Sequence, residues 1–341
     1  MTGPAVLRPR PGAATGVGSM PGDDLAEALR IALGELPDLP FLPELPGRGP
    51  AADMIGRAAA MLVDIAVELQ PSGWRLASHP GVDLRRALDL QARDLDTYAE
   101  VAAQLTGPLK LQVAGPWTLA ASVEVARGDK AIADPGAVRD IAASLREGVA
   151  VLLGDVHERL PGAELILQID EPSLPAVLQG TVPTASGYGT LRAVEEPDVV
   201  AILRDAVTSA GVPVIVHCCA GAPPIPLLQA SGAAAIGLNA EVFGRPGSDA
   251  ESAIGEAIDA GHTLFLGVLP AFGTEADLPT ADAAARPVRE LWRRLAFPPA
   301  ELAAGVVLTP VCGLAGASTA YARGVLARCR IAGRLLVDDP L

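Results

Sequence analysis

The chain is poor in the residues that most often carry metal or nucleophilic chemistry. It has only four cysteines and four histidines among 341 residues. Disulfides are not expected in a large chain of this kind, so each cysteine is a candidate for a metal site or for core packing. Scarce residue types are informative where they gather, and His217 and Cys219 lie two positions apart.

Long apolar segments are also missing. No run approaches the ~20 apolar residues that a membrane-spanning helix needs, and residues 1–16 lack the apolar core of a secretory signal. We therefore expect a soluble, cytoplasmic protein without a membrane partner. The formal net charge of −14 disfavours contact with phosphate backbones, so nucleic acid is not expected as a partner.

Short apolar runs, separated by proline and glycine, organise the chain. Most are apolar throughout, as strands buried on both faces are. Amphipathic segments between them predict helices. The predicted strands are 14–19, 39–44, 109–114, 164–170, 212–218, 234–239, 263–268 and 305–309. The clearest predicted helices are 82–105, 135–159, 195–210, 279–296 and 318–336.

Eight alternating strands and helices predict a single (β/α)8 barrel, with a doubly wound open sheet as the alternative. We expect one catalytic domain over residues 1–341, with a core at about 13–336 and a flexible segment at 1–12. The polar residues favour the barrel, because the C-terminal ends of barrel strands carry the active site. Those at predicted strand ends are Ser19, Glu44, Asp170, Glu171, His217, Cys219, Glu241 and Cys312.

Four of these residues form a candidate metal site. Side chains alternate along a strand, so His217 and Cys219 point to one face and Cys218 to the other. With Glu241 and Cys312 they offer the nitrogen, sulfur and oxygen ligands that zinc takes, usually four in number. A carboxylate is a displaceable ligand, so an incoming thiol could share its place and lose its proton to become a nucleophile.

Each residue also has a plainer interpretation. Taken singly, Cys219 and Cys312 would be ordinary core cysteines, and core packing is favoured for Cys218 and Cys329. His262 opens a predicted strand at the end remote from the candidate site, which favours a structural role. The metal interpretation therefore depends on the four candidate ligands being considered together.

Ordered motifs over nearly the whole chain resemble the C-terminal catalytic barrel of cobalamin-independent methionine synthase. They are VGSMPG at 17–22, LPEL at 42–45, AGPWTL at 114–119, QIDEPSLP at 168–175, HCC at 217–219, Glu241 and PVCGL at 310–314. The resemblance implies a TIM barrel of the methionine synthase and uroporphyrinogen decarboxylase-like type. It also implies a zinc-dependent methyltransferase that converts homocysteine to methionine, with His217, Cys219, Glu241 and Cys312 as the zinc ligands.

The resemblance further implies an amino-acid pocket. Val17, Gly18 and Ser19 match the turn that holds the carboxylate of homocysteine, and Glu44 and Asp170 match the acids that hold its ammonium group. Backbone N–H groups and a hydroxyl suit an anion, whereas two carboxylates suit a cation. The plainer roles are helix capping for Ser19 and ion pairing with arginines for the two acids.

On the methyl-donor side the chain departs from the family pattern. Phe272 stands where the family has the histidine that protonates the departing folate. Ser122 replaces a tryptophan against the pterin, and Ala176 replaces a glutamate that contacts the folate. Arg75 and Trp117 are the remaining candidates for a donor contact. Methyltetrahydrofolate leaves as an amine that needs a proton, so a methylated corrinoid, delivered free or by a corrinoid protein, is an alternative donor.

Three functions stay open at this point. The first is methyl transfer to homocysteine, from methyltetrahydrofolate or a methylated corrinoid. The second is corrinoid-dependent methyl transfer to another thiol of the coenzyme M type, which needs no amino-acid pocket. The third is a non-catalytic or decarboxylase-like barrel of the same superfamily, which needs no metal. Glu44, Asp170 and the turn at 17–19 favour the first.

Overall fold

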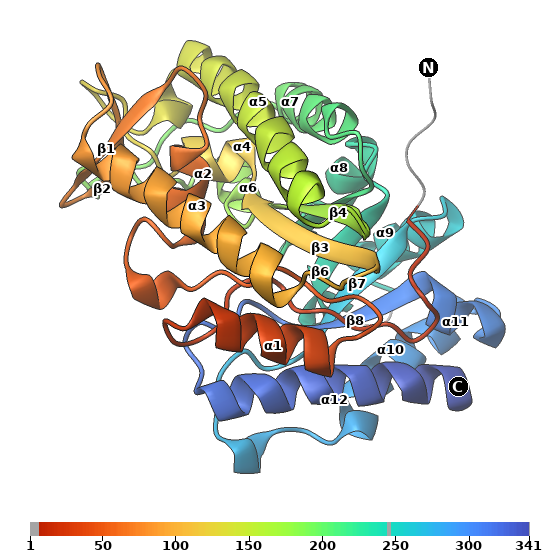
Figure 1. The fold of residues 1–341 in the computed structure, drawn as a ribbon. Helices are drawn as coiled ribbons and strands as arrows, with labels where there is room; N and C mark the ends of the chain where they lie inside the picture. The colour runs from red at the N-terminus through yellow and green to blue at the C-terminus, as the bar shows by residue number, and fades with distance from the viewer. Residues whose placement is uncertain (1–6, 244–246, 341) are drawn as a thin grey trace.

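The computed structural model describes residues 7–243 and 247–340. Its centre is a parallel sheet of six strands in chain order, which curls between α3 and α5 on one side and α10 and α12 on the other (Figure 1). The strands are β3 (Gly107–Ala114), β4 (Ala163–Asp170), β5 (Val214–Cys218), β6 (Ala235–Asn239), β7 (Thr263–Leu269) and β8 (Val306–Pro310). They are buried over most of their length, as strands covered on both faces are.

The predicted strands at 14–19 and 39–44 are irregular segments, so the eight-strand expectation is not met by its first two members. Pro40 and Pro43 remove backbone donors that a regular ladder would use. Both segments still join the sheet through isolated parallel bridges, and thereby connect β8 to β3. The bridges pair Ala14 with Leu308, Ser19 with Glu44 and Phe41 with Lys110.

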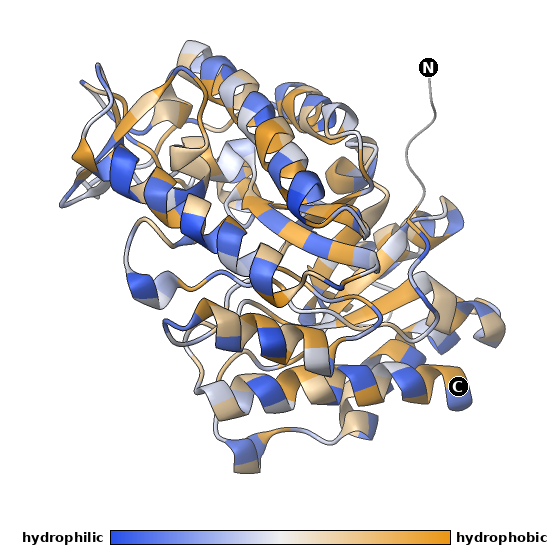
Figure 2. Ribbon diagram, viewed as in Figure 1, coloured by the Kyte–Doolittle hydropathy of each residue, from blue (hydrophilic) through white to orange (hydrophobic). Residues whose placement is uncertain are grey.

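All five helices predicted from periodicity are present. They are α3 (Val82–Val101), α5 (Pro135–Arg159), α7 (Glu196–Ser209), α10 (Ala281–Leu295) and α12 (Thr319–Asp338). Figure 2 shows hydrophilic stripes along these helices and a mostly hydrophobic sheet. Side-chain caps fix two of the starts, because Asp134 accepts backbone N–H bonds at α5 and Ser318 does so at α12.

Shorter helices complete the shell around the sheet. They are α1 (Leu25–Glu35), α2 (Met54–Ala60), α4 (Pro116–Ala120), α6 (Leu174–Gln179), α8 (Ile225–Ala230), α9 (Asp249–Asp259) and α11 (Pro299–Gly305). α12 packs against α1 and β8, which brings distant parts of the chain together (Figure 1). Within the described ranges, no helix combines the length and apolar character needed to cross a bilayer.

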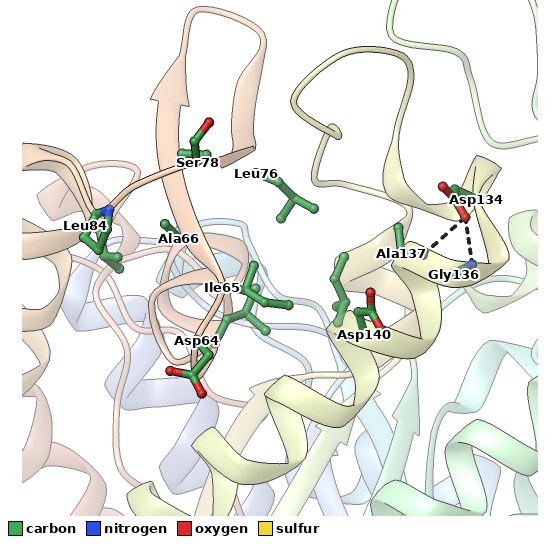
Figure 3. Close-up of a pocket in the computed structure, with 14 residues that line it drawn as sticks. Asp64, Ile65, Ala66, Leu76, Ser78, Leu84, Asp134, Gly136, Ala137 and Asp140 are labelled. Carbon is green, nitrogen blue, oxygen red and sulfur yellow. Dashed lines mark hydrogen bonds between the residues drawn. The ribbon is translucent and has the colours of Figure 1, made fainter.

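An antiparallel hairpin lies outside the main sheet and was not predicted. It consists of β1 (Ala66–Gln70) and β2 (Gly73–Ala77). A cavity of 760 Å³ separates the hairpin from the start of α5, with Ile65 and Leu76 on one side and Asp134 and Asp140 on the other (Figure 3). None of the residues predicted for the active site lines this cavity.

Candidate active site

The candidate site begins at the C-terminal ends of β4 and β5. Asp170 is the last residue of β4, and its register partner on β5 is His217. Nδ1 of His217 lies 2.7 Å from Oδ1 of Asp170, and both side chains are buried. Because the carboxylate occupies Nδ1, the nitrogen left to bind a metal is Nε2.

A close approach from β6 positions the same imidazole. A Cβ at Gly237 would lie 2.8 Å from Cδ2 of His217, so only glycine allows the ring to rest against this strand. The imidazole is therefore held by a hydrogen bond on one side and by backbone on the other. This rigid placement suits a side chain that must meet a ligand in a fixed direction.

Two cysteines from distant parts of the chain meet nearby. Cys219 follows β5 and Cys312 follows β8. A hydrogen bond from Cys219 lowers the pKa of Cys312, helped by the Gly313 N–H and the nearby His217. The same bond, together with burial, raises the pKa of Cys219. A thiolate, a thiol and an imidazole are donors that fit zinc, so the chemistry of the set agrees with the predicted metal.

Glu241 is not brought to these side chains. Glu241 is exposed on a 3-10 turn (Ala240–Phe243), where Asn239 donates to its carboxylate at 3.3 Å and accepts from its backbone N–H at 3.0 Å. Among the described residues, no group of three or more His, Cys, Asp and Glu side chains has the spacing of a metal site. The structure joins Cys219 to Cys312 and His217 to Asp170, and the four-ligand set stays a prediction.

The turn at 17–19 has all its carbonyl groups bonded, and none of its three N–H groups has an acceptor among the described residues. The Val17 carbonyl accepts from Lys110 and Gln168, and the carbonyls of Gly18 and Ser19 accept backbone N–H groups. In the part of the chain that the structure describes, the N–H groups of Gly18 and Ser19 donate to no acceptor. Free donors on a fixed turn are suited to an anionic ligand.

Ser19 links this turn to the cysteine pair. A Cβ at Gly313 would collide with the hydroxyl oxygen of Ser19, so the two residues are in close contact. Gly313 directly follows Cys312. The turn at 17–19 therefore lies against the loop that carries Cys312, although the two segments come from opposite ends of the chain.

The two predicted ammonium-binding acids are both buried and differ in their partners. Glu44 pairs with Arg57 at 3.5 Å and accepts from Gln112 at 3.2 Å. Burial raises the pKa of Glu44, and Arg57 opposes that change. Asp170 accepts from Gln168 at 2.7 Å in addition to its bond with His217. An arginine pair, the plainer interpretation, is thus found for Glu44.

Two of the residues predicted to contact the methyl donor already form contacts within the protein. Arg75, on β2, forms an ion pair with the buried Glu124 at 2.6 Å. Trp117, on α4, is buried and donates its indole N–H to the Val199 carbonyl at 3.2 Å. A tryptophan enclosed in this way has almost no exposed ring, and its placement argues against a contact with a methyl donor.

The other donor-side positions also offer little polar chemistry. Ser122 donates its hydroxyl to the Thr118 carbonyl at 2.7 Å, one helical turn back. Ala176 is half-buried on α6. The side chain of Phe272 follows β7 and is 75% exposed. No titratable group replaces the missing proton donor at this position.

Sequence reasoning missed a set of buried polar residues on β3 and β4. Lys110 and Gln112 lie on β3, and Gln112 is the register partner of Gln168 on β4. Glu171, which follows β4, accepts two backbone N–H groups and the Thr118 hydroxyl at the start of α4, and burial raises its pKa to about 7. The available signal was the alternation of polar residues at 110 and 112 within an apolar run.

The fold and site define a parallel α/β protein in which a pair of cysteines lies near a turn with free N–H groups. The sequence matches the model of the family described as cobalamin-independent synthase, catalytic domain, over residues 12–334. The chain therefore belongs to the cobalamin-independent methionine synthase family and is an enzyme of the methyltransferase class. The resemblance predicted from the ordered motifs is confirmed.

The chain resembles several solved structures to different degrees. A B12-independent methionine synthase from Shewanella sp. W3-18-1, in complex with selenomethionine, is 14% identical with a TM-score of 0.59, covering 96% of this chain and 98% of that one. The carboxyl transferase domain of Rhizobium etli pyruvate carboxylase is 13% identical with a TM-score of 0.35, covering 96% and 55%. A GH10 endoxylanase from a sugarcane soil metagenome is 13% identical with a TM-score of 0.27, covering 72% and 60%. No curated protein matches the sequence.

Proposed function

We propose that this protein transfers a methyl group to the thiol of homocysteine and so forms methionine, with zinc as its metal. The observation that carries the proposal is the contact between Ser19 and Gly313. This contact supports a pocket in which the turn at 17–19 would bind an anion near Cys312 and its neighbour Cys219. A substrate with a carboxylate at one end and a thiol at the other would reach both at once.

The side chains divide the work of the metal site. Asp170 holds Nδ1 of His217 so that Nε2 is presented. Cys219 and Cys312 would bind as thiolates, and Glu241 would complete the set by giving up its hydrogen bond with Asn239. A bound zinc ion would lower the pKa of an incoming thiol and leave it nucleophilic near neutral pH.

The amino-acid end of homocysteine would be held by two kinds of group. The free N–H groups of Gly18 and Ser19 would bind its carboxylate, and Glu44 and Asp170 would bind its ammonium group. Since both acids are buried, each forms a stronger ionic contact than it would in water. The anchored substrate would then present its sulfur in a fixed direction to the methyl group, which accounts for much of the expected rate.

We also propose that the segments at 14–19 and 39–44 act as the first two strands of a complete (β/α)8 barrel. Their isolated bridges to β8, to β3 and to each other support this. A single catalytic domain with a core at about 13–336 would follow, and the family match over residues 12–334 agrees with that extent. Both amino-acid-binding elements would then line one barrel mouth.

Methyltetrahydrofolate is the donor that the family favours, because its members are cobalamin-independent. The family match gives no support to a corrinoid donor or to a corrinoid protein as partner. Phe272 nevertheless leaves the folate amine without the family's proton donor. We therefore propose methyltetrahydrofolate, protonated from solvent or from a group outside the family pattern.

The test measures zinc and product together. Purified protein should contain one zinc per chain and should form methionine from homocysteine and methyltetrahydrofolate. Parallel reactions replace the donor with methylcobalamin, or replace homocysteine with coenzyme M. Protein that contains no zinc and forms no methionine from either donor would overturn the proposal. Methylation of coenzyme M but not of homocysteine would show that the methyl acceptor is a different thiol.

A further inference from the structure

Three polar side chains lie buried beneath the proposed amino-acid pocket. They are Lys110 and Gln112 on β3 and Gln168 on β4, which we call the polar floor. Figure 2 shows the hydrophilic interruptions along β3 in an otherwise hydrophobic strand. A buried lysine and two buried amides are costly to keep unless each is bonded, so their partners are informative.

Two of these side chains, Lys110 and Gln168, donate to the same peptide carbonyl. Lys110 donates from Nζ to the Val17 carbonyl at 2.9 Å and to Oε1 of Gln112 at 3.2 Å. Gln168 donates from Nε2 to the same Val17 carbonyl, also at 2.9 Å. The Val17 oxygen thus accepts two hydrogen bonds, one of them from an ammonium group. Such a bond is stronger than one between neutral groups.

Because the peptide bond is planar, the hydrogen bonds to the Val17 carbonyl also fix the direction of the Gly18 N–H. In a trans peptide the carbonyl of one residue and the N–H of the next point in opposite directions. The bonds to the Val17 carbonyl therefore aim the Gly18 N–H away from the polar floor. They also polarise the peptide, because hydrogen bonds in a chain strengthen one another. The Gly18 N–H is one of three N–H groups in this turn that have no acceptor among the described residues.

We propose that Lys110 is a positioning residue for the carboxylate of the substrate and acts through the Val17–Gly18 peptide. This inference rests on the proposed function, since it assumes an amino-acid thiol as acceptor. Lys110 touches neither the sulfur atoms nor the reacting methyl group. Its effect should therefore be confined to substrates that carry a carboxylate.

The charges around Lys110 agree with this role. Burial lowers the pKa of Lys110 to about 8, and the acids Asp170 and Glu44 oppose that change. The side chain therefore keeps its proton at pH 7 and loses it on moderate alkalinisation. Phe41 lies over the same ammonium, with the ring centroid 5.6 Å away, and provides a cation–π contact.

The matched probe is 3-aminopropanethiol, which keeps the thiol and ammonium groups of homocysteine and lacks the carboxylate. Lys110→Met and Lys110→Gln both remove the charge, and the glutamine variant keeps a polar group for Gln112. For each folded variant we expect KM for homocysteine to rise about tenfold with little change in kcat. The inhibition constant of 3-aminopropanethiol, measured as a competitor, should stay within twofold of wild type.

Three results would overturn the inference. The first is an equal loss of affinity for both thiols, which indicates general damage to the pocket, and the second is no change for either thiol. The third applies to the wild-type enzyme and needs no variant to fold. The preference of the enzyme for homocysteine over 3-aminopropanethiol should fall as pH rises through about 8, and a constant preference from pH 7 to pH 9 would contradict us. Wild-type protein without methionine synthesis would instead refute the proposed function.

Discussion

The candidate site has two halves, one for the methyl acceptor (the acceptor half) and one for the methyl donor (the donor half). They differ in whether their polar groups already have hydrogen-bond partners in the protein. The acceptor half comprises the turn at 17–19, Asp170, His217 and the two cysteines. Within residues 7–243 and 247–340, its N–H groups at 17–19 and Nε2 of His217 have no hydrogen-bond partner. The donor half comprises Arg75, Trp117, Ser122 and Phe272. Its polar members already bond to neighbouring protein groups.

This difference separates binding residues from structural ones. An unsatisfied buried donor or acceptor costs roughly 1–3 kcal/mol, so a fold tends to keep one where a ligand supplies the partner. By that criterion the acceptor half agrees with the proposed binding of a thiol-bearing amino acid. The donor half is built mainly to hold α4 and the β1–β2 hairpin in place.

The largest expected effect comes from removing a proposed metal ligand. Cys312→Ser should lose zinc and reduce methyl transfer by at least about 100-fold, because even groups that only support metal ligands affect activity 10- to 100-fold. Circular dichroism should show an intact fold, since Cys312 is exposed and lies in a loop. Zinc content and methionine formation are the two measurements.

Cys329→Ser is the matched control. Cys329 is buried in α12, 17 residues after Cys312, and its substitution should leave zinc content and turnover per folded molecule unchanged. A Cys312→Ser protein that unfolds while Cys329→Ser is stable would make the metal structural, and would weaken the distinction between the two halves.

The next effect concerns the partner of the imidazole. Asp170→Asn should weaken zinc binding by roughly 10- to 100-fold, because an amide no longer fixes the His217 tautomer that presents Nε2. Competition with a chelator measures this directly and does not depend on substrate binding. Unchanged zinc affinity would show that the His217–Asp170 bond stabilises the wall of the pocket and does not affect metal binding.

A gain of function tests the donor half. Phe272→His should raise methyl transfer from methyltetrahydrofolate by about tenfold, because it restores a titratable group at an exposed position. Initial rates with methylcobalamin should not change, since that donor needs no proton. If the folate rate stays the same, Phe272 lies outside the donor site and the predicted alignment with the family histidine is wrong.

The smallest effect on turnover is expected at Arg75. Arg75→Gln should leave KM for the methyl donor unchanged and should lower the free energy of unfolding by about 1 kcal/mol, because Glu124 loses its ion-pair partner. Steady-state kinetics and urea denaturation distinguish the two results. A large rise in KM for the methyl donor without loss of stability would show that Arg75 binds the donor.

The local pattern of apolar residues was sufficient to predict most strands of the sheet. The last six predicted strands and all five predicted helices were found, because continuous apolar runs and amphipathic periodicity reflect burial directly. The segment at 39–44 forms only isolated bridges because Pro40 and Pro43 remove donors from a ladder that apolarity alone suggests, and no proline explains the irregular form of 14–19. The β1–β2 hairpin was missed because its strands are only partly buried.

The candidate site was predictable as a list of residues but not as an arrangement. His217 and Cys219 stood out by their spacing, and the motifs named the remaining ligands. Nothing in the sequence indicated that Asp170 bonds His217 or that Lys110 reaches Val17 across the sheet. Those contacts depend on strand register, which a single sequence does not define for irregular segments.

The amino-acid sequence by itself determined the chemical types available: scarce thiols and imidazoles placed where buried strands end, in the order typical of one methyltransferase family. Only the tertiary structure decided which of them meet, because curling a parallel sheet brings ends of strands together that are about 300 residues apart, such as Ser19 and Gly313. It also decided which polar groups are left free, since satisfaction of a hydrogen bond is a property of neighbours in space and not of neighbours in the chain.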